Sequence, residues 1–522
     1  MNQLPDVGRV ISLNARLYPQ RPAARDLARA LTFRQWNERS CRLANALIGL
    51  GLRKGDRVAI LAYNGVEWLE IYVAMAKAGL VAVPINYRLL GPEIAYIVAD
   101  AGAQAIIVQS DLAERIEAIQ DDLAIAPSRY IQFGDAANAG GYTAYESLLA
   151  GGAATEPAVA LHGDDPFALM YTSGTTGRPK GAVRSHGATA LLSLISTVEF
   201  GFTRRDTALL VMPMCHANSL FFAFPMAYCG AGCCVYDRRS CEPEHLLATL
   251  ATEHCTFTSL VPTHYIMMLA LPEAVKQRHD VSGVSKLLIS SAPARRETKL
   301  AVMEHFRNSS LFEGYGSTEA GWVTLLRPDE QLTKLGSIGR ELIGTDRIRL
   351  LDEQGVEVEE GEVGELYSRT PYAFSEYWGL PEKTAESIRD SYFSAGDMAR
   401  RDEDGFYQLV DRKKNMIISG GENIYPSEVE SMLGAHPEVL DVAVIGVPDA
   451  KWGESVHAVI VLREGGAATE AEILDWCRPR IAGYKRPRSV AFIDEAEMPR
   501  TATGKVLHRV LRERYTGERA AH

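Results

Sequence analysis

Apolar segments of strand length alternate with amphipathic segments of helix length through the first half of the chain. An apolar run at 57–62 is followed by a segment, 64–78, whose apolar side chains recur at helical spacing. The further elements that this rhythm predicts are strands 81–85, 105–108, 208–212, 233–236 and 255–261 and helices 91–101 and 243–254. Because such alternation is typical of parallel sheets covered by helices, we predict an α/β fold with doubly wound sheets.

The pattern changes after Asp411, where strands follow one another more closely. A capping box, Thr469-x-x-Glu472, marks the start of a helix in this part of the chain. The elements expected there are strands 440–446, 457–462 and 489–493 and helices 470–481 and 505–514. We therefore predict two domains, a large one over 1–411 and a small α+β domain over 412–522.

Composition narrows the class of protein. The 522 residues are 47% hydrophobic, which is enough for more than one core, and the net charge of -11 argues against nucleic acid as the main partner. The first residues lack a basic segment followed by an apolar run, and proline and polar residues interrupt the most apolar stretch, 208–236. We expect no signal peptide and no membrane span, and a cytoplasmic protein.

Eight cysteines are present, and six of them lie between 215 and 255. A zinc site is conceivable there, but the spacings match no common ligand pattern and no Cys-x-x-Cys pair occurs. We favour buried free thiols in a reducing compartment.

The segment 172–181, Thr-Ser-Gly-Thr-Thr-Gly-Arg-Pro-Lys-Gly, has the composition of a phosphate-binding loop. Its glycines allow backbone N–H groups to approach a ligand, and its hydroxyls and Lys180 add donors. The patterns of the flanking segments 167–171 and 181–186 predict strands, so the loop is expected to join two strands. A Walker A loop would instead begin a helix after Gly-Lys-Ser/Thr. The alternative is a flexible surface hairpin.

Four more motifs follow the loop in order: 313–319 (Glu-Gly-Tyr-Gly-Ser-Thr-Glu), 394–397 (Ser-Ala-Gly-Asp), 411–423 (Asp-Arg-Lys-Lys-Asn through Gly-Gly-Glu-Asn) and 499–505 (Pro-Arg-Thr-Ala-Thr-Gly-Lys). In content, order and spacing the chain resembles the adenylate-forming superfamily over nearly its whole length. The resemblance implies a large N-terminal domain with doubly wound sheets and a β-barrel-like part, followed by a small mobile α+β domain. It implies an acyl-CoA synthetase that converts a carboxylic acid, ATP and coenzyme A to acyl-CoA, AMP and pyrophosphate through an acyl-adenylate.

The same resemblance assigns the nucleotide contacts. The phosphate-binding residues would be Thr172, Ser173, Gly174, Thr175, Thr176, Gly177 and Lys180. Thr318 would donate to the α-phosphate, and Glu319 would coordinate Mg²⁺, a hard ion that prefers oxygen ligands. Asp397 and Arg412 would bind the ribose. The residues expected around adenine are Gly314, Tyr315 and Gly316 on one side and Ser291, Ala292 and Pro293 on the other.

The resemblance also assigns residues to the reaction itself. Lys505 would reach the carboxylate and the α-phosphate during adenylation, and His216 would lie beside the acid. The small domain would then rotate about Lys414, and Gly420 and Gly421 would line the tunnel for the pantetheine arm.

The acid itself is less well determined. The segments expected to line its pocket are 216–224, 261–265, 290–293 and 314–323, which are rich in aromatic residues and contain no Arg or Lys. They favour an apolar monocarboxylate, a fatty, aromatic or alicyclic acid, over a dicarboxylate.

Two other functions are compatible with the motifs. One is adenylation with another acceptor, such as a carrier protein or luciferase-like oxidation. The other is a nucleotide-binding regulator without catalysis, against which the joint presence of Lys180, Glu319, Asp397 and Lys505 argues. A homodimer is compatible with the resemblance, since relatives are often dimers.

Overall fold

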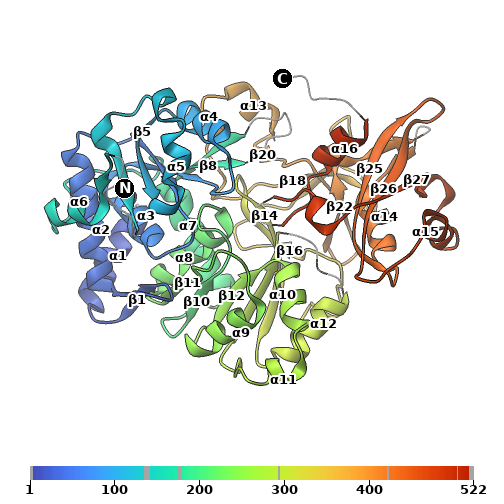
Figure 1. The fold of residues 1–522 in the computed structure, drawn as a ribbon, viewed down its shortest axis with the longest axis horizontal. Coiled ribbons are helices and arrows are strands. Elements are labelled where there is room, and N and C mark those ends of the chain that lie inside the picture. The colour runs from blue at the N-terminus through green and yellow to red at the C-terminus, as the bar shows by residue number, and fades with distance from the viewer. Residues whose placement is uncertain are drawn as a thin grey trace. The chain divides into compact units, whose positions relative to one another are not determined.

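The computed structural model describes residues 4–134, 141–172, 179–291, 294, 296–419, 422–501 and 504–516. The chain forms two compact units, Met1–Arg347 with Ser368–Phe393, and Ile348–Tyr367 with Ser394–His522 (Figure 1). The predicted domain boundary after Asp411 lies inside the second unit. That a moving domain begins at this boundary stays a prediction.

One sheet of the first unit is parallel except for its last strand, β9, which is antiparallel to β8. Across the sheet the strands are β7 (Thr143–Ala144), β6 (Tyr130–Phe133), β5 (Ala103–Gln109), β3 (Arg57–Leu61), β4 (Val81–Ile85), β8 (Pro166–Thr172) and β9 (Lys180–Ser185). Successive residues of β3 belong to different cores, since Val58 packs with helix α3 (Glu67–Ala78) and Ala59 with helix α4 (Gly91–Ala101). Helices therefore cover both faces of this sheet, as the alternating pattern predicted.

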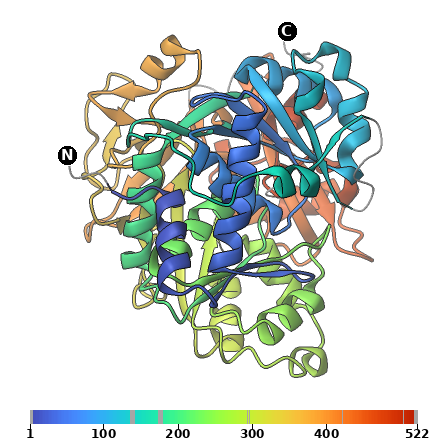
Figure 2. The same ribbon diagram turned by 90° about the vertical axis from the view of Figure 1, so that its left-hand side faces the viewer.

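The other large sheet is parallel in its middle and antiparallel at both ends (Figure 2). Across it the strands are β16 (Arg340–Glu341), β15 (Gly321–Leu326), β14 (Ser310–Ser317), β13 (Lys286–Ser290), β12 (Phe257–Leu260), β10 (Thr207–Leu210), β11 (Gly232–Val235), β1 (Pro22–Arg25) and β2 (Ala30–Thr32). A single core, which contains Val58 and Ile60 of the first sheet and Phe257 and Phe312 of the second, joins the two sheets. Strands β8 and β14, which lead to the predicted phosphate-binding loop and contain most of the 313–319 motif, therefore belong to one packed body.

The helices of the first unit connect these strands or cover them. They are α1 (Val7–Leu17), α2 (Phe33–Gly49), α3, α4, α5 (Ala113–Glu117), α6 (Tyr145–Gly151), α7 (His186–Glu199), α8 (Ala217–Cys229), α9 (Pro243–Thr252), α10 (Pro262–Leu269), α11 (Glu273–Lys276), α12 (Arg296–His305) and α13 (Pro381–Glu386). A short hairpin, β19 (Ile388–Arg389) and β20 (Tyr392–Phe393), follows α13.

The second unit contains two smaller sheets (Figure 1). The antiparallel sheet comprises β17 (Arg349–Leu351), β18 (Gly364–Tyr367), β21 (Asp397–Arg401) and β22 (Tyr407–Arg412). The C-terminal sheet comprises β24 (Glu422–Ile424), β23 (Ile417–Ser419), β26 (Gly453–Leu462), β25 (Val439–Asp449) and β27 (Ser489–Phe492), with helices α14 (Pro426–Leu433), α15 (Glu470–Cys477) and α16 (His508–Thr516). The predicted fold class, a large α/β part with a small α+β part, is confirmed.

Two helix boundaries in this unit were predicted wrongly. Helix α15 begins at the capping box as predicted, but it ends at Cys477 rather than near Ile481. Helix α16 begins at His508 rather than at Lys505, because Arg500 and Val506 form a β-bridge around the turn at Gly504, whose φ is +81°. Lys505 is therefore part of a tight loop and not of a helix.

Two expectations drawn from composition concern membranes and thiols. In the described ranges, no helix combines the length and the apolarity needed to cross a membrane. All eight cysteines are free, with Cys229 and Cys241 half-buried and the others buried.

Candidate active site

The predicted phosphate-binding loop joins β8 and β9, as expected from the flanking patterns. Thr172 and Lys180 pair across this hairpin, so the two ends of the loop lie opposite each other. Five of the predicted loop residues lie outside the described residues: Ser173, Gly174, Thr175, Thr176 and Gly177. The Lys180 ammonium lies 3.9 Å from the centre of the Tyr377 ring. Burial, which disfavours the charged form, lowers the pKa of Lys180.

The turn between β14 and β15 positions Thr318 and Glu319. Glu319 is 8% exposed, and its Oε1 accepts hydrogen bonds from Thr172 Oγ1 and Tyr377 Oη, each at 3.0 Å. Only glycine suits position 316, because a Cβ there would lie 2.2 Å from the Gly321 carbonyl oxygen. The fold thus brings the first residue of the predicted phosphate-binding loop to the predicted Mg²⁺ ligand.

The oxygen donors at this position fit Mg²⁺, because a carboxylate and a hydroxyl are hard ligands. Among the residues that the structure describes, no group of three or more His, Cys, Asp or Glu side chains could enclose a metal. Glu319 and Thr172 would hold the ion together with phosphate oxygens and water, which is how Mg²⁺ is usually bound.

The predicted adenine site lies at the carboxyl ends of β13 and β14. These strands are parallel, and Ser290 pairs with Gly314, so Ser291 and Tyr315 emerge next to each other. Ser291 has a left-handed φ of +68°. Ala292 and Pro293 lie outside the described residues. Carboxyl ends of parallel strands are where open α/β sheets bind ligands, which agrees with the predicted roles.

His216 is the residue immediately before α8. Burial, and to a lesser extent the charge of Arg88, lower the pKa of His216 to about 4, so the imidazole is neutral at pH 7. Its Nε2 is buried and has no hydrogen-bond partner among the described residues. The nearby Asn218 donates to Ser290 Oγ at 2.9 Å, which ties the start of α8 to the edge of β13. His216 is thus close in the fold to the carboxyl end of β13.

In the second unit, Asp397 and Arg412 pair across β21 and β22. Arg412 Nε lies 2.9 Å from Asp397 Oδ1. Partial desolvation of its ammonium by the surrounding chain, followed by the charge of Arg412, lowers the pKa of Lys505. The fold therefore brings together three of the residues that the motifs predicted for the ribose and for adenylation.

The remaining predicted residues of this unit are Lys414, Gly420 and Gly421. Lys414 is in a 3₁₀ turn, Lys413–Asn415, between β22 and β23. Gly420 and Gly421 lie outside the described residues, and the flanking Ser419 and Glu422 pair in the hairpin of β23 and β24.

Two residues of the site were not predicted from the sequence. Tyr377 contacts both Lys180 and Glu319, but it is 58 residues from Glu319 and belongs to none of the motifs. Arg184 donates from Nη1 to the carbonyl oxygens of Thr318 (3.4 Å) and Glu319 (3.2 Å).

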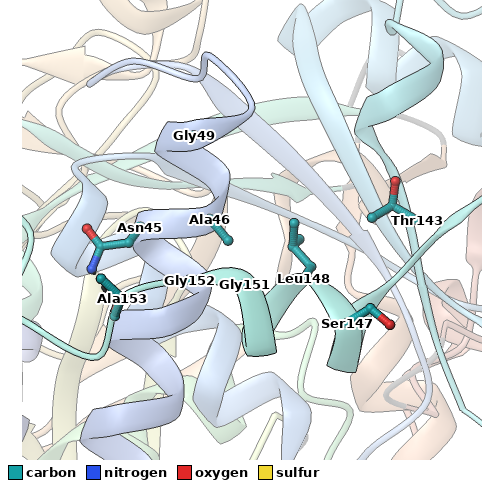
Figure 3. A pocket seen from close by; sticks show the side chains of 9 residues that line it. All are labelled: Asn45, Ala46, Gly49, Thr143, Ser147, Leu148, Gly151, Gly152 and Ala153. Atoms are coloured by element: carbon teal, nitrogen blue, oxygen red, sulfur yellow. Dashed lines mark hydrogen bonds between the residues drawn. The ribbon is translucent and has the colours of Figure 1, made fainter.

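A separate hollow of about 520 Å³ lies between α2 and α6 (Figure 3). Its lining residues are Asn45, Ala46, Gly49, Thr143, Ser147, Leu148, Gly151, Gly152 and Ala153. None of the predicted site residues lines it, and its walls bear no ionisable side chain.

A family model described as AMP-binding enzyme matches residues 11–378, and a model of the AMP-binding enzyme C-terminal domain matches residues 428–505. The chain belongs to the AMP-binding enzyme family. The resemblance inferred from the five motifs is thereby confirmed, and so is the class of enzyme, an AMP-forming acid–thiol ligase.

Relatives in this family are named for different acids. A feruloyl-CoA synthase from Amycolatopsis sp is 38% identical over 96% of this chain and 97% of its own length. The long-chain-fatty-acid–CoA ligase FadD13 from Mycobacterium tuberculosis is 36% identical over 93% of each chain. A crystal structure of the anthranilate CoA ligase AuaEII with anthranoyl-AMP has a TM-score of 0.89 and 29% identity, covering 99% of this chain and 98% of that one.

Proposed function

We propose that this member of the AMP-binding enzyme family activates a carboxylic acid with an apolar body and transfers the acyl group to coenzyme A. The observation that best supports the proposal is the contact of Thr172 and Tyr377 with Glu319, beside Lys180. A phosphate chain with its Mg²⁺ needs a cation, hydroxyl donors and a carboxylate at one place, and these side chains provide them.

In the first half-reaction, a carboxylate oxygen of the acid bonds to the α-phosphorus of ATP. The bond from that phosphorus to the bridging oxygen of pyrophosphate breaks, and pyrophosphate leaves. Thr172 and Lys180 hold the departing phosphates, Thr318 donates to the α-phosphate, and Lys505 offsets the negative charge that develops. When bound at Glu319, Mg²⁺ neutralises part of the phosphate charge.

In the second half-reaction, the deprotonated thiol sulfur of coenzyme A bonds to the acyl carbon. The bond from that carbon to the AMP oxygen breaks, and the thiol proton passes to solvent. We propose that residues 412–522 rotate about Lys414 between the two steps, and that Gly420 and Gly421 leave room for the pantetheine arm.

His216 is proposed to contact the carboxylate of the acid. Because its pKa is about 4, the ring is neutral under physiological conditions. A neutral ring can donate one hydrogen bond to a carboxylate oxygen without a competing ion pair that would hold the carboxylate away from the α-phosphate.

The body of the acid is proposed to lie against α8 and β15. Phe221 and Phe222 of α8 contact Trp322, with ring centres 6.1 and 5.5 Å apart. All three side chains are buried. Buried aromatic walls stabilise an apolar ligand in proportion to the area removed from water.

A panel of acids tests this proposal. Acids of about six carbons or more are expected to give higher kcat/KM than acetate or malonate, because each buried methylene contributes about 0.8 kcal/mol. The measurement is acyl-CoA formed with ATP, Mg²⁺ and coenzyme A. A clear preference for acetate or malonate would contradict the assigned pocket.

Asp397→Ala is expected to weaken ATP binding, because each ribose hydrogen bond to a charged acceptor contributes roughly 1.5–3 kcal/mol. The measurement is the dissociation constant for ATP, with Asp404→Ala as control, since Asp404 is an exposed carboxylate in the same unit. An unchanged dissociation constant in the Asp397 variant would show that Asp397 does not bind the ribose.

A further inference from the structure

Arg184 is a buried arginine in the interior of the first unit. It is on β9, outside the segments that were expected to line the acid pocket but in contact with two of them, and it is 1% exposed. Fully buried arginines are rare unless an acidic group is paired with them. No ion pair among the described residues includes Arg184.

The guanidinium uses only one of its three nitrogens in hydrogen bonds. Nη1 donates to the carbonyl oxygens of Thr318 and Glu319, at 3.4 and 3.2 Å. Nε and Nη2 are buried and have no partner within the described ranges. Donors that are buried without a partner cost free energy, so their retention calls for a ligand or another compensating group.

Arg184 remains a cation despite its burial. Desolvation lowers the pKa of the guanidinium to about 10, which still leaves it protonated at neutral pH. The negative charge of Glu319 acts on the guanidinium, but the two side chains form no ion pair, so an anion that entered beside Arg184 would relieve the remaining cost of its burial.

The two unused nitrogens define the shape of that anion. Nε and Nη2 are adjacent on one edge of the guanidinium, and their N–H bonds are the parallel pair that matches the two oxygens of a carboxylate. The guanidinium carbon lies 5.4 Å from the centre of the Phe221 ring. Phe221 is one of the aromatic residues proposed to contact the body of the acid.

A phosphate of ATP fits the position less well. Arg184 reaches the 318–319 turn through main-chain carbonyls, whereas the carboxylate of Glu319 is held by Thr172 and Tyr377. The guanidinium thus contacts the backbone of the turn and the aromatic side of the site.

We propose that Arg184 binds a second carboxylate at the far end of the substrate, so that the substrate class is a dicarboxylic acid with an apolar spacer. This inference rests on the proposed function, since it names the acid of the same reaction. It departs from the monocarboxylate expected from the sequence, which relied on the lack of Arg and Lys in four lining segments. Arg184 lies in β9, outside those segments.

Matched pairs of acids test the inference with the wild-type enzyme. The pairs are hexanoate with adipate, octanoate with suberate, and benzoate with terephthalate, each assayed for kcat/KM of CoA thioester formation. The diacid is expected to exceed its monoacid at least tenfold in one or more pairs. A preference for the monoacid in every pair would overturn the inference and leave the proposed function intact. No thioester from any acid would instead overturn the proposed function and this inference with it.

Substitution of Arg184 separates substrate binding from support of the turn. Arg184→Met is expected to lower the ratio of diacid to monoacid kcat/KM at least tenfold, because it removes the charge and keeps an unbranched side chain. An equal loss for both members of each pair would mean that Arg184 only supports the 318–319 turn, and would overturn the inference. If Arg184→Met does not fold, Arg184→Lys replaces it, since lysine keeps the charge but lacks the parallel pair of N–H groups. The ratio of diacid to monoacid kcat/KM is then measured for the lysine variant, with the same expected result.

Discussion

Lys505→Ala is expected to slow acyl-adenylate formation by about 100-fold or more, since a positioned cation opposite developing charge contributes on that scale. Transfer of the acyl group from ready-made acyl-adenylate to coenzyme A should remain largely intact. Lys505 lies in a loop closed by hydrogen bonds from Thr501 N to Lys505 O (2.7 Å) and from Lys505 N to Thr501 Oγ1 (3.1 Å). These bonds use the backbone of Lys505 and not its side chain, so the alanine variant is expected to remove the charge with little change of fold.

Gly421→Leu is expected to give the opposite result. A branched side chain in the proposed tunnel should block thioester formation and leave pyrophosphate release in a single turnover nearly normal. Lys414→Pro should resemble Gly421→Leu if it holds the adenylating arrangement, because proline restricts φ at the proposed hinge.

The measurement for this set is each half-reaction alone. Lys505→Arg is the matched control, since it keeps a positive charge and should retain more adenylation than Lys505→Ala. If Lys505→Ala and Gly421→Leu lose both half-reactions equally while they remain folded, the alternating use of two faces of the small domain is wrong for this protein.

Several strands and helices of the first unit could be predicted because their apolar residues follow a strict period. Strand β3 and helix α3 lie where the apolar pattern placed them, within three residues at each end. The end of α15 and the start of α16 could not be predicted in the same way. The terminal turns of these helices are polar and show no apolar periodicity. The start of α16 also depends on a β-bridge between Arg500 and Val506.

The candidate site residues within contiguous motifs could be predicted because glycine, hydroxyl and charged residues at fixed spacing imply a ligand. Tyr377 and Arg184 could not be found in that way. Arg184 and Glu319 are 135 residues apart and meet only when β9 packs against the 318–319 turn. In a strand that alternates apolar and polar residues, an arginine is expected on the solvent side, whereas here helices cover both faces.

Glu319→Gln is expected to reduce pyrophosphate release by about 100-fold, because the amide cannot supply the negative charge that Mg²⁺ requires. The substitution keeps the size of the side chain, and its amide oxygen can still accept from Thr172 Oγ1 and Tyr377 Oη, which now lie 3.0 Å away. The loss should therefore come from charge rather than from packing. The measurement is pyrophosphate release as a function of Mg²⁺ concentration.

Tyr377→Phe tests the role of Tyr377, which was not predicted from the sequence. It keeps the ring beside Lys180 and removes only the hydroxyl that donates to Glu319. A hydrogen bond to a charged group contributes about 1.5–3 kcal/mol, so pyrophosphate release should fall by roughly 10- to 100-fold and need more Mg²⁺ for half its maximum. If Tyr377→Phe matches wild type at every Mg²⁺ concentration while Glu319→Gln is impaired, the hydroxyl does not orient the carboxylate, and the contribution of Tyr377 is limited to its ring.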